Sequence, residues 1–200
     1  MKNYLIKLIF LVTFLSFHSL AALGPDELVK KTAEDVLHII KTDKEIQKGN
    51  KEKIYKLAEE KILPNFDFNK IARLVLGRNW RSASDKQKKD FIVQFRTLLL
   101  KTYAVALSKY KDQIIEFKPT KISETADIVI VKSEIIQSGG QPIKVNYALS
   151  KKDENWLVFD IVIEGVSLVT NYRSQFSSEI RRNGMDTLIK KLVKKNNRKK

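Results

Sequence analysis

The chain has 200 residues, of which 43% are hydrophobic and 30% charged, a composition typical of a folded globular protein rather than a disordered one. It contains no cysteine and only two histidines, His18 and His38. This excludes disulfides, thiolate metal sites and a cysteine nucleophile, and leaves little material for a histidine metal site or a Ser-His pair. The formal net charge of +15 favours partners with anionic surfaces.

Residues 1–21 have the pattern of a cleaved signal peptide. Two lysines accompany an apolar run over 8–17, and residues 19–21 read Ser-Leu-Ala, a small-x-small cleavage site. The run is too short to span a bilayer comfortably, although an uncleaved anchor helix is the alternative. Cleavage after Ala21 removes two lysines and no acidic residue, which lowers the net charge from +15 to +13. We therefore expect an exported, soluble mature protein.

The first half of the mature chain predicts helices. Apolar residues of 26–48 recur at a helical period, and two acidic residues occupy the first turn, where they are favourable. Asn50 is positioned to cap a second helix, which Pro64 ends. A third helix is predicted over 68–76 and ends at a glycine.

The longest predicted helix begins at a capping box, Ser84-Asp85-Lys86-Gln87. Its apolar stripe is unusually wide. Such a stripe is typical of a helix that lies across a sheet or lines a cavity, and ordinary core packing is the alternative for each residue. The stripe consists of Phe91, Phe95, Leu98, Leu99, Thr102 and Ala106, widened by Ile92, Tyr103, Leu107 and Tyr110.

After Tyr110 the hydrophobic period changes from 3.6 to 2, which predicts antiparallel strands joined by short turns. Gly165 breaks the last strand at a sharp corner, and Gly184 separates two closing helices. The predicted strands are 113–117, 127–137, 143–150 and 156–163, with turns at 138–141 and 152–155.

Helices followed by strands predict an α+β fold, in which N-terminal helices pack on a curved four-stranded antiparallel sheet. We expect one domain over 22–193 and a basic tail over 194–200. The strands 127–136 and 156–163 are apolar on both pleat faces and require cover on both. An apolar cavity between helices and sheet, suited to hydrocarbon chains, is one interpretation of this surplus, and a densely packed core is the other.

The basic tail favours contact with anionic lipid headgroups, and a solvated, frayed end without a partner is the alternative. Nucleic acid is not an expected partner. The aromatic residues are scattered at core spacing rather than gathered on an exposed strand, and an exported protein rarely meets nucleic acid.

Catalytic candidates are few. Asp160 and Glu164 lie four residues apart on a strand, about 13 Å by the strand rise, which is too far for a carboxylate pair. Asp160 alone is a candidate general base, and the favoured alternative is an ion pair with Arg73, Arg81 or Arg173. The sequence shows no phosphate-binding glycine loop, metal-ligand spacing or nucleophile elbow.

Four separated segments, in the same order along the chain, resemble the MlaC family, also called the toluene-tolerance auxiliary protein family. The similarity covers about residues 25–193, and the start of the last helix at Gly184 also fits. The segments are 63–68, 76–81, 95–104 and 156–176, and the last carries the structural motif residues Trp156, Asp160, Gly165, Tyr172 and Arg173.

The resemblance implies an NTF2-like fold and a periplasmic phospholipid carrier rather than an enzyme. It implies phospholipid as cargo, no cofactor, and two partners: an inner-membrane ABC transporter with an MCE-domain subunit, and an outer-membrane lipoprotein complex. Such a carrier moves lipid between the membranes to maintain outer-membrane lipid asymmetry. Two alternatives remain at this point, an NTF2-like small-molecule enzyme with Asp160 as base and a non-lipid adaptor for membrane complexes.

For a carrier, we expect the acyl chains to run between the long helix and the sheet, with the headgroup at the mouth in water. The lipid-binding residues predicted on this basis are Leu76, Phe91, Phe95, Leu99, Tyr103, Val129, Val131, Val145, Tyr147, Leu149, Phe159, Ile161, Ile163 and Val166.

Overall fold

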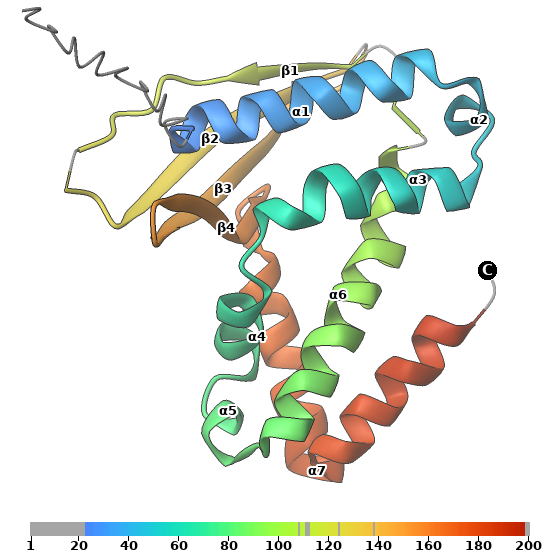
Figure 1. Ribbon diagram of the computed structural model, residues 1–200, viewed down its shortest axis with the longest axis vertical. Helices are drawn as coiled ribbons and strands as arrows, with labels where there is room; N and C mark the ends of the chain where they lie inside the picture. The colour runs from blue at the N-terminus through green and yellow to red at the C-terminus, as the bar shows by residue number, and fades with distance from the viewer. Residues whose placement is uncertain (1–22, 108, 111–112, 124, 138, 199–200) are drawn as a thin grey trace, which may run out of the picture.

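The structure is a computed structural model that describes residues 23–198 except positions 108, 111–112, 124 and 138. The predicted signal peptide lies outside these residues. Figure 1 shows two parts, a sheet with helix α1 lying along it, and a body of helices that extends away from the sheet.

The N-terminal helical region divides at its capping residues. Helix α1 (Pro25–Thr42) ends at Asp43, whose carboxylate accepts hydrogen bonds from the amides of Glu45 and Ile46 and thereby begins α2 (Lys44–Gln47). The single predicted helix over 26–48 is therefore two helices. Asn50 caps α3 (Lys51–Leu57) as predicted. This helix continues into a π-helical turn, η1 (Ala58–Ile62), and a 3₁₀ turn, η2 (Leu63–Asn65).

The later helices also begin at local caps. The Asp67 carboxylate caps α4 (Phe68–Leu76), and a short helix α5 (Asn79–Ser82) follows that the sequence did not predict. The capping box is confirmed at the start of α6 (Asp85–Leu107). The Gln87 amide donates to Ser84 Oγ, and the Ser84 amide donates to Gln87 Oε1.

The last helix, α7 (Leu168–Asn197), is divided at Gly184, where φ is +78°, so its two halves form a hairpin. It continues beyond the boundary at 193 that we expected for the basic tail. Asn196 is buried against α6, where its amide donates to the Gln94 carbonyl.

The strands form one antiparallel sheet in chain order, which confirms the α+β class. The sheet has five strands rather than four. Glu164 and Gly165 both have positive φ, +48° and +80°, which makes a tight hairpin turn where the sequence predicted a corner. The strands are β1 (Ile114–Phe117), β2 (Ile128–Ile136), β3 (Ile143–Lys152), β4 (Asn155–Ile163) and β5 (Val166–Ser167).

Helix α6 does not lie across the sheet. It packs against α4 and α7 along its first half and against α3 further on, and in Figure 1 it runs from the far end of the helical body toward the sheet. Phe95 contacts the rings of Tyr172 and Phe176 edge-on, with centroids 5.0 and 5.6 Å apart. The first half of the apolar stripe, with Phe91, Phe95 and Leu98, therefore serves a helical core, whereas Thr102 and Tyr103 are exposed.

The sheet is covered unequally on its two faces. Val29 of α1 packs on the inner face against Val131 and its neighbours. On the outer face, Ile114, Ile128 and Ile130 remain 62%, 57% and 51% exposed. The expectation that both faces of β2 are covered is therefore wrong, because no helix packs over that side of it in the described structure.

Candidate apolar ligand cavity

An apolar cavity of about 350 Å³ lies beneath α1. It is bordered by α1, the segment 62–66, the end of α6 and the inner face of the sheet. Its lining consists of Leu28, Val29, Thr32, Ala33, Val36, Leu37, Ile62, Asn65, Phe66, Ala106, Leu107, Tyr110, Ile115, Ile135, Tyr147, Val158 and Ile161.

Helix α1 supplies the largest share of the lining. Its lining residues fall at positions i, i+1, i+4, i+5, i+8 and i+9 from Leu28, which places them on one face of the helix. The opposite face carries the ion pairs Lys30–Glu34 and Lys31–Asp35 in solvent. Because of this division, α1 is a solvated cover whose inner surface is apolar.

A β-bulge sets the lining that β4 contributes. Ala148 pairs with Asp160 and Leu149 pairs with Val158, so Phe159 has no partner in the ladder. The extra residue allows Val158 and Ile161 to line the same cavity despite their odd spacing. Phe159 instead packs against the helical body. A strict period of two predicts Phe159 and Ile161 on one face of the strand, which is why both were predicted as lipid-binding residues.

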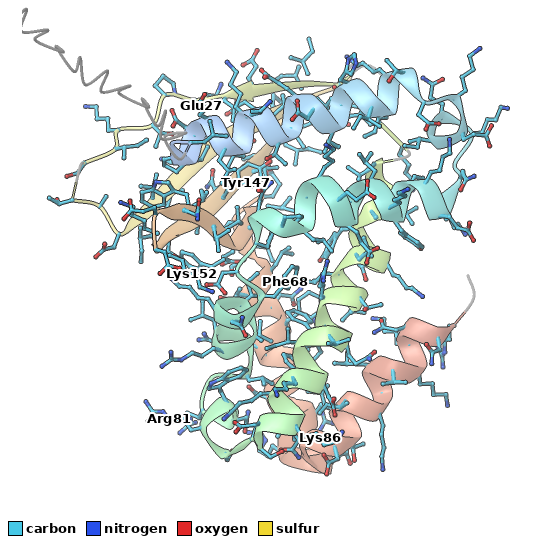
Figure 2. The ribbon with its side chains drawn as sticks, viewed as in Figure 1. Glu27, Phe68, Arg81, Lys86, Tyr147 and Lys152 are labelled. Carbon is cyan, nitrogen blue, oxygen red and sulfur yellow. The ribbon has the colours of Figure 1, made fainter. Side chains whose placement is uncertain are left out.

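Tyr147 places a hydroxyl in this largely apolar wall, beneath α1 in the view of Figure 2. Burial raises the pKa of its phenol above the ordinary value, and a hydrogen bond with Ser133 opposes that effect. The side chain therefore remains a neutral phenol near pH 7. A neutral hydroxyl costs far less to bury than a charge, so the wall stays compatible with hydrocarbon.

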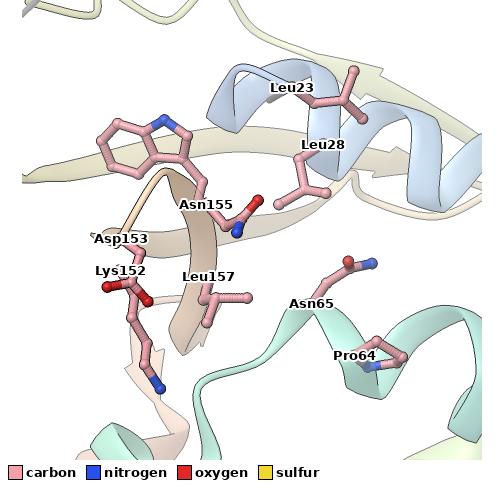
Figure 3. Close-up of a pocket in the computed structure, with 9 residues that line it drawn as sticks. Leu23, Leu28, Pro64, Asn65, Lys152, Asp153, Asn155 and Leu157 are labelled. Carbon is pink, nitrogen blue, oxygen red and sulfur yellow. The ribbon is translucent and has the colours of Figure 1, made fainter. Parts of the chain in front are cut away.

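Two grooves meet the cavity at Leu28 and Asn65, which line all three spaces. The larger groove, about 440 Å³, is more open and more polar; Figure 3 shows Leu28, Asn65 and Leu157 pointing into it from α1, η2 and β4. The second, about 200 Å³, runs between α1 and η1. The mouth of the cavity therefore lies between α1 and η2. We take the smaller apolar space as the ligand site, because the open groove offers little dry surface.

The structure places the predicted lipid-binding residues in several different environments. Tyr147 and Ile161 line the cavity. Leu76 and Phe91 lie in the helical core, and Phe95, Leu99 and Phe159 also border a space of only about 30 Å³. Tyr103 and Val166 are exposed to solvent, and neither lines the cavity. The rest pack within or beside the sheet: Val129, Val131, Val145 and Leu149, all buried, and Ile163, half-buried.

Sequence reasoning missed the contribution of α1. The helix itself was predicted, but none of its residues was among the predicted lipid-binding residues. One signal was present: the apolar face of 28–37 is two residues wide at every turn, broader than packing on one strand requires. The cavity expected between residues 91–107 and the sheet is present in part: Ala106 and Leu107 line it together with sheet residues, whereas Phe95 and Leu99 border only the space of about 30 Å³ beside Phe159.

Asp160 has a structural role in the described chain. Its carboxylate accepts hydrogen bonds from the Ser167 hydroxyl at 2.5 Å and from the Val169 amide at 3.1 Å, at the start of α7. The favoured ion pair with an arginine is not formed. Arg173 instead donates from Nε to the Leu74 carbonyl at 2.6 Å. Among the described residues, no cluster of His, Asp or Glu has the arrangement of a metal site.

The remaining motif residues have packing roles. Trp156 packs on the inner face of the sheet and borders the open groove, and Tyr172 is 7% exposed in the helical core.

Within residues 23–198, as far as they are described, no helix has the length and apolar character needed to cross a membrane.

The fold and cavity together define an α+β protein with an apolar cavity, a candidate ligand site, under its first helix. The chain belongs to the MlaC family, whose sequence profile matches residues 30–194. This confirms the resemblance inferred from the four segments.

Three relatives can be compared directly. A solved structure, the phospholipid-binding protein from Ralstonia solanacearum in complex with a phospholipid, is 32% identical, with a TM-score of 0.81 over 87% of this chain and 97% of that one. The toluene tolerance protein ttg2D of Pseudomonas putida is 26% identical over 84% of this chain and 78% of its own length. The intermembrane phospholipid transport system binding protein MlaC of Haemophilus influenzae is 26% identical over 87% of this chain and 83% of its own length.

Proposed function

We propose that the chain binds a phospholipid in the cavity beneath α1 and carries it through the periplasm between the outer and inner membranes. The observation that carries this proposal is the apolar cavity of about 350 Å³ in a fold shared with a phospholipid-bound relative. Its membership of the family supports a binding and transport role rather than catalysis. Asp160, the alternative base, is already engaged by Ser167 and Val169.

The energetics require the acyl chains to be enclosed. A two-chain phospholipid carries roughly 30 methylenes, each worth about 0.8 kcal/mol when kept from water. A carrier that left one chain in solvent could not compete with a bilayer for the lipid. The cavity is at the low end of the roughly 300–1,000 Å³ typical of ligand pockets. We therefore propose that α1 moves outward from the sheet to admit both chains.

The headgroup stays at the mouth, because a buried phosphate needs dedicated cationic partners. Among the described residues that line the cavity there is no Lys or Arg. The two grooves outside it are bordered by Lys31, Lys61 and Lys152, where a phosphate remains hydrated. Exchange then requires a partner that favours the open arrangement of α1. The proposed partners are the MCE-domain subunit of an inner-membrane ABC transporter and an outer-membrane lipoprotein complex, with lipid asymmetry of the outer membrane as the result.

The test fills the cavity from α1. An Ala33→Trp variant places an indole where the acyl chains are expected, and Val93→Trp, on a position of α6 that is 58% exposed, is the matched control. Protein purified from cells is analysed by native mass spectrometry and then offered vesicles of phosphatidylethanolamine and phosphatidylglycerol.

We expect bound phospholipid in the wild type and in Val93→Trp, and at least a tenfold loss of uptake in Ala33→Trp with its circular dichroism retained. Wild-type protein that neither co-purifies with phospholipid nor takes it up from vesicles would rule out the proposed function.

A further inference from the structure

The first helices of the chain are balanced in charge. Residues 25–62, from α1 to η1, contain nine lysines and nine acidic residues. Many of these charges are paired at the surface, as in Lys31–Asp35 at 3.4 Å and Lys53–Asp43 at 3.0 Å. This part of the molecule has no excess of positive charge to offer a partner.

A second surface, formed by α4, α5 and the start of α7, carries basic residues and no acidic ones. Residues 68–84 and 165–178 contain no aspartate or glutamate. Helices α4 and α7 pack against each other, so the two segments lie side by side. This basic face carries four exposed arginines and one half-buried lysine: Arg73, Arg78, Arg81, Arg173 and Lys70.

The arginines of the basic face lack counter-charges within the described chain. Every ion pair among the described residues of the chain uses a lysine, and none joins an arginine to a carboxylate. The acidic residues at its borders are engaged elsewhere. Asp67 caps α4, Asp160 binds the start of α7, and Glu179 pairs with Lys191 at 2.7 Å. The guanidinium groups are therefore free to bind an external acid.

One of these arginines is fixed in position. The Nε–H of Arg173 donates to the Leu74 carbonyl, and its side chain passes 3.9 Å from where a Cβ would stand on Gly77. The hydrogen bond orients the guanidinium, so a partner pays less side-chain entropy on binding. Arg81 projects outward from α5, at the end of the molecule opposite the sheet (Figure 2).

We infer that this basic face is a docking surface for an acidic segment of a partner protein. A planar guanidinium binds a carboxylate through two parallel hydrogen bonds, a geometry that lysine cannot provide. A bilayer surface attracts lysine and arginine alike, and the chain gathers lysines at the end of α7 instead. Because this face uses arginine on a protein that is otherwise rich in lysine, we favour the carboxylates of a partner protein over a bilayer surface as its ligand. The docking surface is separate from the candidate lipid site, because none of its five basic residues lines the cavity or either groove.

The test compares two triple variants that remove the same charge. Arg73→Gln/Arg78→Gln/Arg81→Gln alters the basic face, and Lys30→Gln/Lys44→Gln/Lys56→Gln alters the balanced helices. A hexaglutamate peptide at low salt is the probe, measured by calorimetry and by ¹⁵N–¹H NMR titration of the full chain. We expect about tenfold weaker binding for the arginine variant, less than twofold for the lysine control, and wild-type shift changes concentrated at 70–81 and 173.

Equal weakening in both variants, or shift changes concentrated at 190–198, would overturn the assignment. So would an arginine variant that loses binding to phosphatidylglycerol vesicles while its peptide binding is unchanged. Arg81→Glu, a single change on exposed α5, tests the same face without disturbing the packing of α4 on α7. Lipid uptake remains at the wild-type level in all these variants, which separates this result from the test of the proposed function.

Discussion

The side-chain amide of Asn65 donates a 2.9 Å hydrogen bond to the hydroxyl of Thr32, and this contact joins η2 to α1 at the edge of the cavity. The Thr32 hydroxyl in turn donates to the Leu28 carbonyl within α1. Thr32 and Asn65 line both the cavity and the groove between α1 and η1. The pair therefore holds the mouth closed with a polar contact, which is weaker and more readily exchanged with water than apolar packing.

Bridging this pair covalently should trap the cavity in its closed state. A Thr32→Cys/Asn65→Cys variant introduces the only two thiols of the chain. With the thiols joined as a disulfide or by a short reducible cross-linker, we expect uptake of fluorescent phospholipid to fall at least tenfold, because α1 can no longer separate from η2. Reduction should restore uptake.

Each single cysteine variant, treated in the same way, controls for modification of the mouth itself. Uptake that proceeds at the same rate with the bridge intact would place the access route elsewhere in the molecule.

Phe95 is expected to support the helical body rather than the lipid. It is 1% exposed and contacts Phe91, Tyr172 and Phe176 through its ring. A Phe95→Ala change should lower the free energy of unfolding by roughly 3–5 kcal/mol, since it removes a buried ring and leaves a void between α6 and α7. Urea unfolding measures this loss.

The folded fraction of Phe95→Ala should still take up phospholipid at low temperature, where the fold survives. A variant of near wild-type stability that fails to load lipid would return Phe95 to the ligand site, where the sequence placed it. Val93→Trp, on the exposed face of the same helix, provides the matched comparison.

The elements that the sequence predicted well begin or end at local signals. Asn50, the Ser84–Gln87 box and Gly184 each act on the few residues beside them, so their effect can be read without the rest of the fold. The same applies to the alternation that revealed the strands. These signals are sufficient to establish the α+β class and the order of most elements.

The location of the cavity depends on distant relationships that periodicity does not encode. The stripe of α6 fits a sheet and a helical core equally well, and only tertiary packing distinguishes them. The bulge at Phe159 changes which residues of β4 share a face without altering the alternating pattern. Family resemblance implied a cavity, and the structure was needed to place it beneath α1.

Asp160 should prove to be a structural residue. An Asp160→Asn change leaves one of the two carboxylate oxygens and removes the charge that favours the start of α7. We expect a loss of about 1 kcal/mol in the free energy of unfolding, by analogy with other helix caps, and unchanged lipid content by native mass spectrometry. If the wild type shows a measurable turnover that Asp160→Asn abolishes without a change in stability, the result would instead favour the alternative of an enzyme with Asp160 as base.

The two halves of α7 are joined across Gly184 by an interaction that depends on pH. Glu179 Oε1 accepts hydrogen bonds from Lys191 Nζ and Asn183 Nδ2, both at 2.7 Å, and the bond from Lys191 is the main reason that the pKa of Glu179 lies below its ordinary value of 4.5. A carboxyl whose pKa is lower in the folded state stabilises the fold above its unfolded pKa. That contribution disappears as the pH falls through the folded pKa.

A Glu179→Gln variant should therefore melt at a lower temperature than the wild type at pH 7, and the difference should shrink progressively once the pH is below 4.5. The control is Glu154→Gln, which removes the acid of the Lys151–Glu154 pair in a solvated turn and should change the melting temperature little at any pH. Thermal unfolding followed by circular dichroism across the acid range measures both. A Glu179→Gln difference that stays constant with pH would show that packing of the side chain, and not its charge, holds the two halves of α7 together.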